Sequence, residues 1–499
     1  MKKLLLSLVA IVATTGSLYA QITADALRFS QTNYGSSARF KSMGGAQIGV
    51  GGDMSSLGGN PAGLGLFTKS EFSLTPEFNM VKGKATYLGQ NTDATKNKFN
   101  LNNVGVVFYS PTFKPKGQDP SKGVISAVFG IGYNRNNDFT ANYVYEGQNA
   151  PNSITDYFAE EANRFHNGGT LDDFSVEKMA EGSELIRYNQ PSDAFLSNAA
   201  SISNQRQSEV RSGSNSEVNI AGALNISNKF YIGASVAFVN VRYLTDRVFS
   251  ESGTTVANSP TMGTKYDMNY FVNSEIKGSG FNGRIGLIYR PETNIRLGAT
   301  LQTPTWLYFD DTQSTTMDSK LYSGPLSGIY TNPDGISSIT YRLRTPLKGS
   351  FGASYVIGNR ALLSADVDYI DYSTMQYSVD QDNNQGQLNN LNRQIKTNYK
   401  EAVNFRIGAE YKVDNAVSLR AGYGKNGTPL KNDKDSYFAT DFYSAGLGYR
   451  VGNYYVDLAY QRVENNVDLD SYYLNNEQEP VANIKTGRNN VFLTFGVRF

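Results

Sequence analysis

The feature that most constrains this chain is a two-residue alternation of apolar and other side chains, which recurs from about residue 70 to the C-terminus. Alternation of this period predicts β-strands, because successive side chains of a strand point to opposite faces. The clearest case is the segment 403–412, in which Val403, Phe405, Ile407, Ala409 and Tyr411 alternate with Asn404, Arg406, Gly408, Glu410 and Lys412. Segments 417–424, 443–450, 454–461 and 491–499 repeat the pattern.

The composition fits strands with one wet face and one dry face. Hydrophobic residues make up 39% of the 499 residues, yet the chain holds 33 Tyr, 27 Phe and 48 Gly. No run of about 18 apolar residues occurs after the N-terminal segment, so no membrane-spanning helix is expected. If the mature chain crosses a membrane, it must do so as a closed β-barrel.

Residues 1–20 are predicted to be a secretory signal peptide. Lys2 and Lys3 provide the basic start, Leu4 to Ala13 the apolar middle, and Ala20 a small residue before the cleavage point. The position after Ala20 is not a cysteine, which excludes a lipoprotein anchor. We therefore expect an exported protein.

The spacing of the turns separates a barrel from a soluble β-sandwich, which would also alternate. Short turns are expected around residues 227–229, 291–293, 358–360, 414–415 and 452–453, and long polar stretches lie between them, at 247–264, 308–338, 377–398, 427–438 and 464–487. Short periplasmic turns that alternate with long extracellular loops are typical of an outer-membrane barrel. We count about fourteen strands between residues 69 and 499, an even number that places both termini in the periplasm.

Charge and residue inventory exclude several classes of function. Lys and Arg number 46 against 45 Asp and Glu, so the basic excess of a nucleic-acid binder is missing. The chain has no cysteine and one histidine, His166, which rules out disulfides, thiolate metal sites and any site that needs two histidines. No metal, no cofactor and no catalytic residue is predicted.

Two segments depart from the alternation. Residues 21–68 are dense in glycine and lack the Lys-Ser or Lys-Thr of a phosphate-binding loop, so we expect a compact plug packed inside the strands. Residues 137–214 form a long insertion in which Asp172 to Arg187 is predicted to be helical, with Phe174, Met179 and Ile186 among charged residues. Without further context this helix would simply be a solvated surface helix.

Several motifs, in this order and spacing, resemble the outer-membrane long-chain fatty-acid transporter family (FadL-like proteins), which includes aromatic-hydrocarbon uptake proteins. The motifs are Ala38-Arg39, Gly44-Gly45-Ala46, Gly52-Asp53, Asn60-Pro61-Ala62-Gly63, Leu363 to Tyr369, Asp371-Tyr372-Ser373, Arg406 to Tyr411, Ser418 to Tyr423, Thr428-Pro429 and Tyr443 to Tyr449. The resemblance implies an all-β transmembrane antiparallel barrel of fourteen strands closed by an N-terminal hatch, in the outer membrane of a Gram-negative-type bacterium.

It also implies a passive route for a hydrophobic ligand such as a fatty acid or hydrocarbon. The ligand would be captured among the extracellular loops, bound in the lumen, and released laterally into outer-membrane lipid at a strand kink when the hatch moves. Asn60, Pro61 and Ala62 are the expected hatch residues, with a plain structural turn as the alternative. The candidate capture residues are Phe174, Met179, Leu185 and Ile186, and the candidate kink residues are Gly130 and Gly132.

The protein is further expected to be a monomer whose last strand, ending at Phe499, is read by the barrel-assembly machinery. Alternative functions are a general or specific porin, a structural or adhesive barrel, a haem receptor, and an outer-membrane esterase. The esterase would need a Ser–His pair, for which only His166 is available in a polar loop. The expected hatch argues against an open porin.

Overall fold

The computed structural model describes residues 17–499, except positions 32, 34, 118, 174, 258–260, 262, 333–334, 380–384 and 477. Most of the predicted signal peptide, residues 1–16, therefore lies outside the described residues. Within the described part, no helix combines the length and apolar character needed to cross a membrane.

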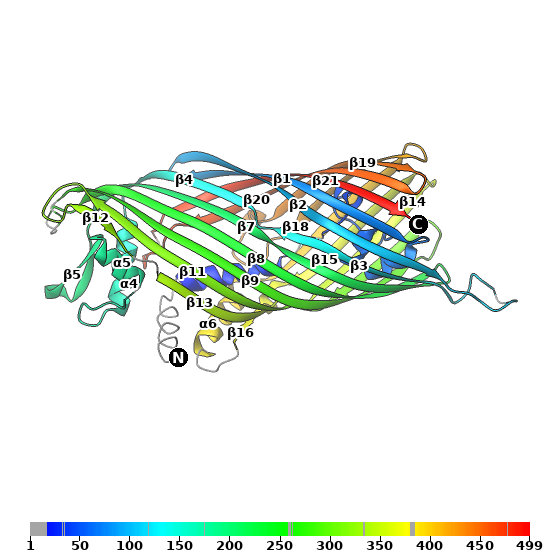
Figure 1. Cartoon of the computed structure of the whole chain (residues 1–499), viewed down its shortest axis with the longest axis horizontal. Helices are drawn as coiled ribbons and strands as arrows, with labels where there is room; N and C mark the ends of the chain where they lie inside the picture. Colours follow the sequence, from blue (N-terminus) through cyan, green and yellow to red (C-terminus); the bar gives the residue numbers. More distant parts are fainter. Residues whose placement is uncertain are drawn as a thin grey trace.

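The molecule is a closed antiparallel barrel (Figure 1) in which β1 pairs with both β2 and β21. The described sheet has 19 strands. In four cases two consecutive strands are the two halves of one interrupted wall strand, and β12 (Gly328–Thr331) is a short strand in the loop between β11 and β13. Counting each pair once gives the fourteen strands that the sequence predicts. They are β1 (Glu71–Tyr87), β2 (Gln90–Pro111), β3 (Val124–Asp138) with β4 (Ala141–Asn149), β7 (Ala199–Ile226), β8 (Phe230–Thr255), β9 (Lys265–Tyr289), β10 (Ile295–Gln302) with β11 (Trp306–Leu321), β13 (Gly335–Arg344) with β14 (Lys348–Ile357), β15 (Ala361–Asp371) with β16 (Gln376–Ser378), β17 (Glu401–Lys412), β18 (Val417–Asn426), β19 (Thr440–Val451), β20 (Tyr454–Asp470) and β21 (Val481–Arg498).

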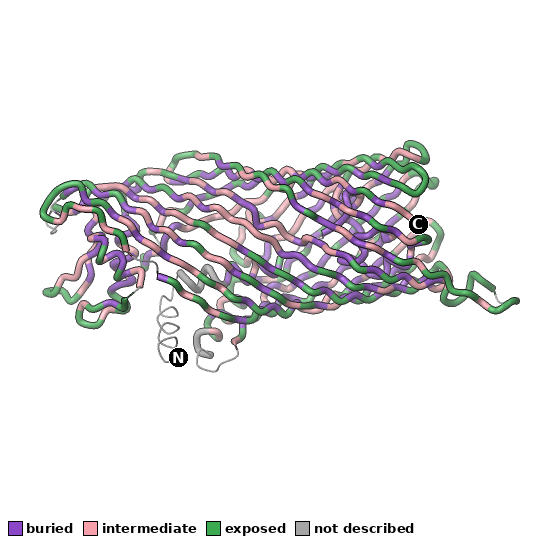
Figure 2. The backbone as a smooth tube through the Cα atoms, in the orientation of Figure 1, coloured by how far each residue is buried: buried purple, intermediate pink, exposed green. Residues whose placement is uncertain are grey.

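The predicted alternation is confirmed strand by strand. In β17, Val403, Phe405 and Ile407 are exposed on the outer surface, whereas Asn404 and Arg406 are buried towards the lumen. Figure 2 shows the same alternation of exposed and buried positions along the wall. Apolar side chains that face outwards and polar ones that face the lumen are the pattern of a membrane barrel.

The short connections lie at the end of the barrel that also holds the C-terminus (Figure 1). In the turn between β7 and β8, Ser227 and Asn228 are both at positive φ, 56° and 53°, and the Lys229 N–H donates to Ile226 O (3.1 Å), as in a type I′ turn. The opposite end carries the long connections and is therefore the extracellular end. Two wall lines break where Pro304 and Pro346 remove a ladder N–H.

Much of the sequence predicted as loop is strand. Residues 308–338, for example, fall largely into β11, β12 and β13. The outward face of these segments is mostly polar because it stands beyond the apolar band, whereas inward residues such as Phe309 and Met317 are buried. The outward apolar face that marks a membrane-spanning strand is therefore lost.

The predicted insertion 137–214 is also narrower than expected. Residues 141–149 belong to β4, and β7 begins at residue 199. Between them lie helices α4 (Ile154–Phe165) and α5 (Val176–Gly182) and the hairpin of β5 (Ile186–Asn189) and β6 (Ala194–Ser197). We call residues 150–198 the cap, because they stand at the extracellular end (Figure 1).

The N-terminal glycine-rich segment fills the barrel near the end that holds the C-terminus (Figure 1). It comprises helix α3 (Ala38–Ser42) and the short helices η1 (Met54–Leu57) and η2 (Pro61–Leu66). Nearly every residue from 36 to 67 is buried. We call residues 36–67 the hatch. Helix α2 (Ser17–Ser30) precedes it and lies nearer the extracellular end.

Candidate functional site

An apolar chamber lies in the lumen on the extracellular side of the hatch. Phe29 of α2 projects into it, and its ring lies 4.7 Å from Phe309, 6.0 Å from Phe139 and 6.2 Å from Tyr243, between ring centres. We call this cluster the aromatic chamber. Its buried residues are Ala26, Phe29, Phe139, Val239, Val241, Tyr243, Ile276, Leu307, Phe309, Tyr341, Leu343, Ile370, Tyr372, Met375, Tyr377, Ile395, Tyr399 and Ala402.

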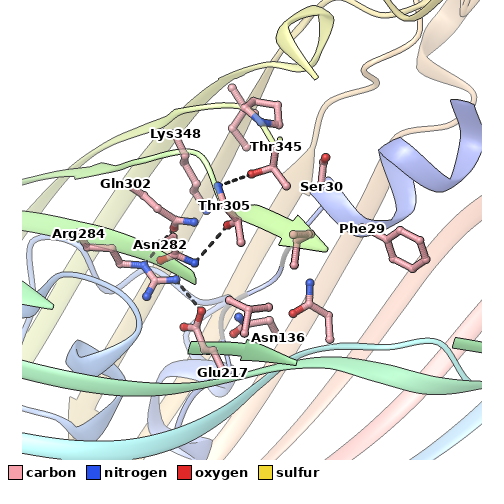
Figure 3. A pocket seen from close by; sticks show the side chains of 15 residues that line it. Phe29, Ser30, Asn136, Glu217, Asn282, Arg284, Gln302, Thr305, Thr345 and Lys348 are labelled. Carbon is pink, nitrogen blue, oxygen red and sulfur yellow. Dashed lines mark hydrogen bonds and ion pairs between the residues drawn. The ribbon is translucent and has the colours of Figure 1, made fainter. Parts of the chain in front are cut away.

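A small cavity of about 20 Å³ lies beside Phe29 (Figure 3). One side is apolar, formed by Phe29, Val239, Leu307 and Ile370, and the other is lined by polar side chains from the strands around the lumen. Three buried polar atoms on its lining have no partner within the described residues, namely Ser30 Oγ, Asn215 Oδ1 and Asn282 Oδ1. With Phe29 in place the cavity has room for about one water molecule, so a larger molecule could bind here only by displacing Phe29.

The cations beside this cavity are already compensated. Arg284 donates to Glu217 (2.8 Å), Asn219 (2.8 Å) and Gln302 (3.1 Å), and Lys348 lies 3.3 Å from Asp368. Buried charges are stable only when paired and hydrogen-bonded in this way. The site thus selects by shape and apolar contact more than by net charge.

The predicted hatch residues form a corner that is bonded on three sides. Asn60 caps η2 by accepting the Ala62 N–H (3.1 Å), and its amide donates to Ile48 O (2.8 Å) and Leu287 O (3.2 Å). Pro61 occupies the first helical position, where its missing N–H costs nothing. The corner thus ties η2 both to the rest of the hatch and to wall strand β9.

At several places, paired glycines on neighbouring wall strands leave the space into which the hatch packs. Gly233 and Gly286 are paired across β8 and β9, and a Cβ on either would come within 2.4 Å of Pro61 or 2.0 Å of Asn60. Side chains at these positions would therefore displace the corner. The same arrangement recurs at the pairs Gly105–Gly132 against Met54 and Leu57, Gly298–Gly352 against Ile48 and Gly49, and Gly408–Gly422 against Met43 and Gly44.

Ion pairs fix the first hatch helix to the opposite part of the wall. Arg39 binds Glu410 through two hydrogen bonds of 2.9 and 3.0 Å. Arg420 bridges Glu410 and Asp457 at 2.6 Å each. A further carboxylate, Asp366, accepts the backbone N–H of Gln47 and Ile48. The hatch is thus held to the lumen wall by charge as well as by shape.

The predicted kink residues lie in a regular part of the wall. Gly130 and Gly132 pair in register with Val107 and Gly105 of β2, and both leave room for Leu57 of the hatch. The pairing of β3 with β7 is irregular at two other places, between Val124 and Ser126 and between Arg135 and Asn137.

After Asn134 the described pairing of β3 with β2 ends, and β4 pairs with β7 alone. Asp138 accepts hydrogen bonds from Asn79 and Asn100, whose side chains face the lumen, so β3 bends inwards at this point. We call the resulting gap in the ladder, along residues 90–102 of β2, the seam. Phe99, 72% exposed on the outer surface, lies on this unpaired edge.

The candidate capture residues gather in the core of the cap. Met179, Leu185 and Ile186 are at most 3% exposed and pack with α4 and with the inner faces of β8, β9 and β11. Phe174 lies outside the described residues. The predicted surface helix is therefore wrong in part, because α5 is short and its apolar residues are covered by α4, which sequence reasoning missed.

Two further cap residues, His166 and Glu161, have side chains that could act in catalysis or metal binding. His166 Nδ1 accepts the Gly169 N–H (3.2 Å), and its ring packs against Tyr188 and Phe195. Burial raises the pKa of Glu161 to about 7, although Arg164 lies 2.6 Å away and opposes the shift. Among the described residues, no group of three acidic or histidine side chains could hold a metal ion.

Comparison with known proteins gives a family and a fold. Residues 186–482 match the family model described as outer membrane protein transport protein (OMPP1/FadL/TodX). A search of curated proteins found no match.

Solved structures agree with this match. A Pseudomonas aeruginosa FadL homologue is similar with a TM-score of 0.52 and 13% identity, covering 94% of this chain and 98% of its own. The Pseudomonas putida toluene transporter TodX has a TM-score of 0.52 and 14% identity, covering 94% and 99%. A TodX monoaromatic hydrocarbon channel mutant, deltaS2, has a TM-score of 0.53 and 13% identity, covering 93% and 99%.

Proposed function

We propose that this chain, which belongs to the FadL/TodX family of outer membrane transport proteins, is a passive channel for hydrophobic molecules such as long-chain fatty acids or hydrocarbons. The observation that carries the proposal is the aromatic chamber, an apolar cluster enclosed in the lumen beside the polar side chains of the cavity. The chamber is occupied by Phe29, a side chain of the same chemical class as the ligand. An apolar ligand gains free energy by replacing Phe29 there.

Capture takes place in the cap. Its core, with Met179, Leu185 and Ile186, is a buried apolar cluster at the extracellular end of the barrel. We place Phe174 in the same role from the sequence. Because Met179 is unbranched and polarizable, it adapts to ligands of different shape. A ligand enters by loosening the contact between the cap and the inner faces of β8, β9 and β11.

Release takes place laterally at the seam, which is contiguous with the aromatic chamber. Phe139 follows the inward bend of β3 directly and contacts Phe29. The segment between α2 and the hatch is bonded to the same bend, since the Asn33 amide donates to Asn137 (3.1 Å) and the Gly35 N–H donates to Asn136 (3.3 Å). Displacement of Phe29 therefore pulls on the strand that borders the seam.

Asn60, Pro61 and Ala62 act in gating as the fixed end of the hatch. Their bonds and the Gly233–Gly286 notch hold η2 in place while the segment before residue 36 moves. Gly130 and Gly132 contribute by letting Leu57 seat against β3 rather than by bending it. The ligand runs down its gradient into lipid, so no energy source is required.

The C-terminal strand bears on how the barrel is assembled in the membrane. Phe499 is exposed, and its N–H donates to Ser70 O (2.9 Å), so the end of β21 is ordered at the periplasmic rim. We propose that this end is recognised by the barrel-assembly machinery and that the finished barrel works as a monomer.

The proposal can be tested with a single-tryptophan reporter. The chain has one tryptophan, Trp306, which is 44% exposed on the outer surface. In a Phe29→Trp, Trp306→Phe variant, emission reports on the aromatic chamber, and we expect a red shift when a long-chain fatty acid is added in detergent. The wild-type protein is the control, because Trp306 should not respond. Fatty acid retained in equilibrium dialysis without any change in emission would contradict the assigned site, and failure to retain it would contradict the function.

A further inference from the structure

A second cavity, of about 590 Å³, lies on the outer side of the extracellular end. It is formed where helix α6 (Gln385–Asn398) meets the ends of β13 and β17 and the loop after β18. We call it the basic cleft, after the side chains that line it: Arg344, Lys396, Lys400 and Lys431. Its back is formed by Met375 and Tyr399, which also belong to the aromatic chamber.

Hydrogen bonds to the backbone fix the segments that form the basic cleft. Tyr399 pairs with Leu430 in a β-bridge, and Lys431 N–H donates to Asn398 O (2.9 Å). At the other side, the Asn392 side chain bonds both backbone groups of Tyr377, at 2.8 and 3.0 Å. The geometry of the four cations is therefore supported by ordered elements.

The charge of the basic cleft is not balanced. Glu401 is the one carboxylate on its lining, beside four cations. Arg344, Lys396 and Lys431 are exposed, and none of the four cations forms an ion pair with another described residue. This contrasts with the lumen, where Arg284, Arg406 and Arg420 are all paired with carboxylates. An unbalanced cationic cleft attracts an anion.

The height of the basic cleft identifies the source of that anion. On the strands of the cleft, the outward apolar band ends at Leu347, Tyr369 and Val403, which are 49%, 53% and 51% exposed. On neighbouring β11 the residue paired with Arg344 is Trp306, an outward aromatic side chain of the kind that marks the membrane interface. Arg344 lies three residues beyond Leu347 along the wall, and Glu401 lies two residues beyond Val403. The cleft therefore stands directly above the hydrocarbon layer, at the level of the lipid head groups of the outer leaflet.

We propose that the basic cleft binds the phosphate groups of a phosphorylated outer-leaflet lipid. Arg344 offers a planar fork that matches phosphate oxygens, and the three lysines add point charges around it. Basic pockets at the membrane surface bind anionic head groups in this way. The acyl chains of the same lipid would lie against Tyr369 and Val403 on the outer wall.

The test compares lipid binding to the full-length protein in detergent by native mass spectrometry. The probes are a bisphosphorylated lipid A-type glycolipid and the same glycolipid with its phosphates removed. We expect the wild-type protein to retain the phosphorylated form, and a variant with Arg344→Gln, Lys396→Gln, Lys400→Gln and Lys431→Gln to retain it at least about tenfold less. A second variant, Lys396→Arg, Lys400→Arg and Lys431→Arg, should bind as the wild type does.

The matched control removes four cations at the opposite end of the barrel, through Lys114→Gln, Lys116→Gln, Lys122→Gln and Lys229→Gln. It should bind the phosphorylated glycolipid like the wild type, and heat-modifiable migration should show that every variant is folded. Equal loss in the control, equal retention of the dephosphorylated glycolipid, or full competition by inorganic phosphate or by oleate would each overturn the proposal. The first two results would exclude a specific phosphate site, and competition would assign the cleft to a soluble anion or a carboxylate.

Discussion

At the scale of single residues, the hatch corner at Asn60 and Pro61 is in close contact with the wall. We predict that Gly286→Ala destabilises the folded barrel by about 1–3 kcal/mol, because the new Cβ would lie 2.0 Å from Asn60 Oδ1. The measurement is the temperature at which the barrel loses its heat-modifiable form. Gly283→Ala, in the same strand, is the control, since its nearest neighbour would lie at 3.8 Å. Equal effects of the two substitutions would show that the hatch does not rest in the Gly233–Gly286 notch.

Removing the corner's own side chain tests its role in gating. Asn60→Ala leaves Ile48 O and Leu287 O without their donor and uncaps η2, at a cost of about 1–2 kcal/mol. We expect uptake of a hydrophobic tracer by cells to fall several-fold while barrel assembly survives, because the wall ladders are untouched, and Pro61→Ala should act in the same direction. Asn415→Ala, in the exposed turn between β17 and β18 at the periplasmic end, should leave uptake unchanged. Normal uptake by folded Asn60→Ala protein would show that the corner is only a structural turn with no role in gating.

Glu161 makes the stability of the cap depend on pH. Its pKa is about 7 in the folded cap against 4.5 as its ordinary value, so the folded cap binds the proton more tightly than the unfolded chain. The contribution of Glu161 to cap stability is therefore full below pH 4.5, falls as the pH rises to about 7, and does not fall further well above it. Amide hydrogen exchange in α4 should be less protected at pH 8 than at pH 6, after correction for intrinsic rates. Glu161→Gln should remove most of this difference, whereas Glu160→Gln should keep it. Persistence of the full difference in Glu161→Gln would contradict the assignment.

The sequence predicts hatch residues better than chamber residues. Asn60 and Pro61 stand out because their turn chemistry is local and needs no partner. Phe29 carries no such signal. It lies in helix α2, which begins within the predicted signal peptide, and its partners Phe139, Tyr243 and Phe309 are more than 100 residues away. A period-2 reading of the inward faces of β8 and β11 would have marked Val239, Val241, Leu307 and Phe309 as apolar side chains in a polar lumen.

At the scale of elements, the cap is a separable unit whose removal should leave the barrel intact. Replacing Ile154–Phe195 by a short glycine–serine linker removes α4, α5 and the β5–β6 hairpin, while β4 and β7 keep their pairing up to Asn149 and Ser203. We expect uptake to fall several-fold at low ligand concentration and to approach the wild-type rate at saturation, because capture is lost but passage is not. Replacing residues 112–123, the turn at the opposite end, is the control. A loss of uptake that persists at saturating ligand would place the cap in passage rather than capture.

Element prediction from sequence succeeds where one face of a strand meets lipid and fails beyond it. The segment 403–412 alternates because lipid requires apolar side chains on one side, and it is found in β17. The outer parts of β8, β9 and β11 are polar on the face that meets water and were expected as loops. The inward bend of β3 lacks a proline, and its nearest glycines, Gly130 and Gly132, serve the hatch instead.

At the scale of the whole molecule, a barrel, a hatch and an apolar chamber together describe a route for hydrophobic molecules that excludes bulk water. The barrel closes through β1 and β21, and the hatch fills one end of its lumen. A general porin needs an open aqueous lumen, whereas this lumen is crossed by bonded hatch backbone and by the aromatic chamber. The membrane-facing wall and the family match both place the protein in the outer membrane.

The most direct test of this account is tracer entry into sealed lipid vesicles that contain the purified full-length protein and no energy source. We predict that a labelled long-chain fatty acid, or a labelled aromatic hydrocarbon, enters faster than into protein-free vesicles, whereas a labelled sugar of similar mass enters at the protein-free rate. Entry of both tracers at similar accelerated rates would identify a porin. Entry of neither above the protein-free rate would contradict transport altogether.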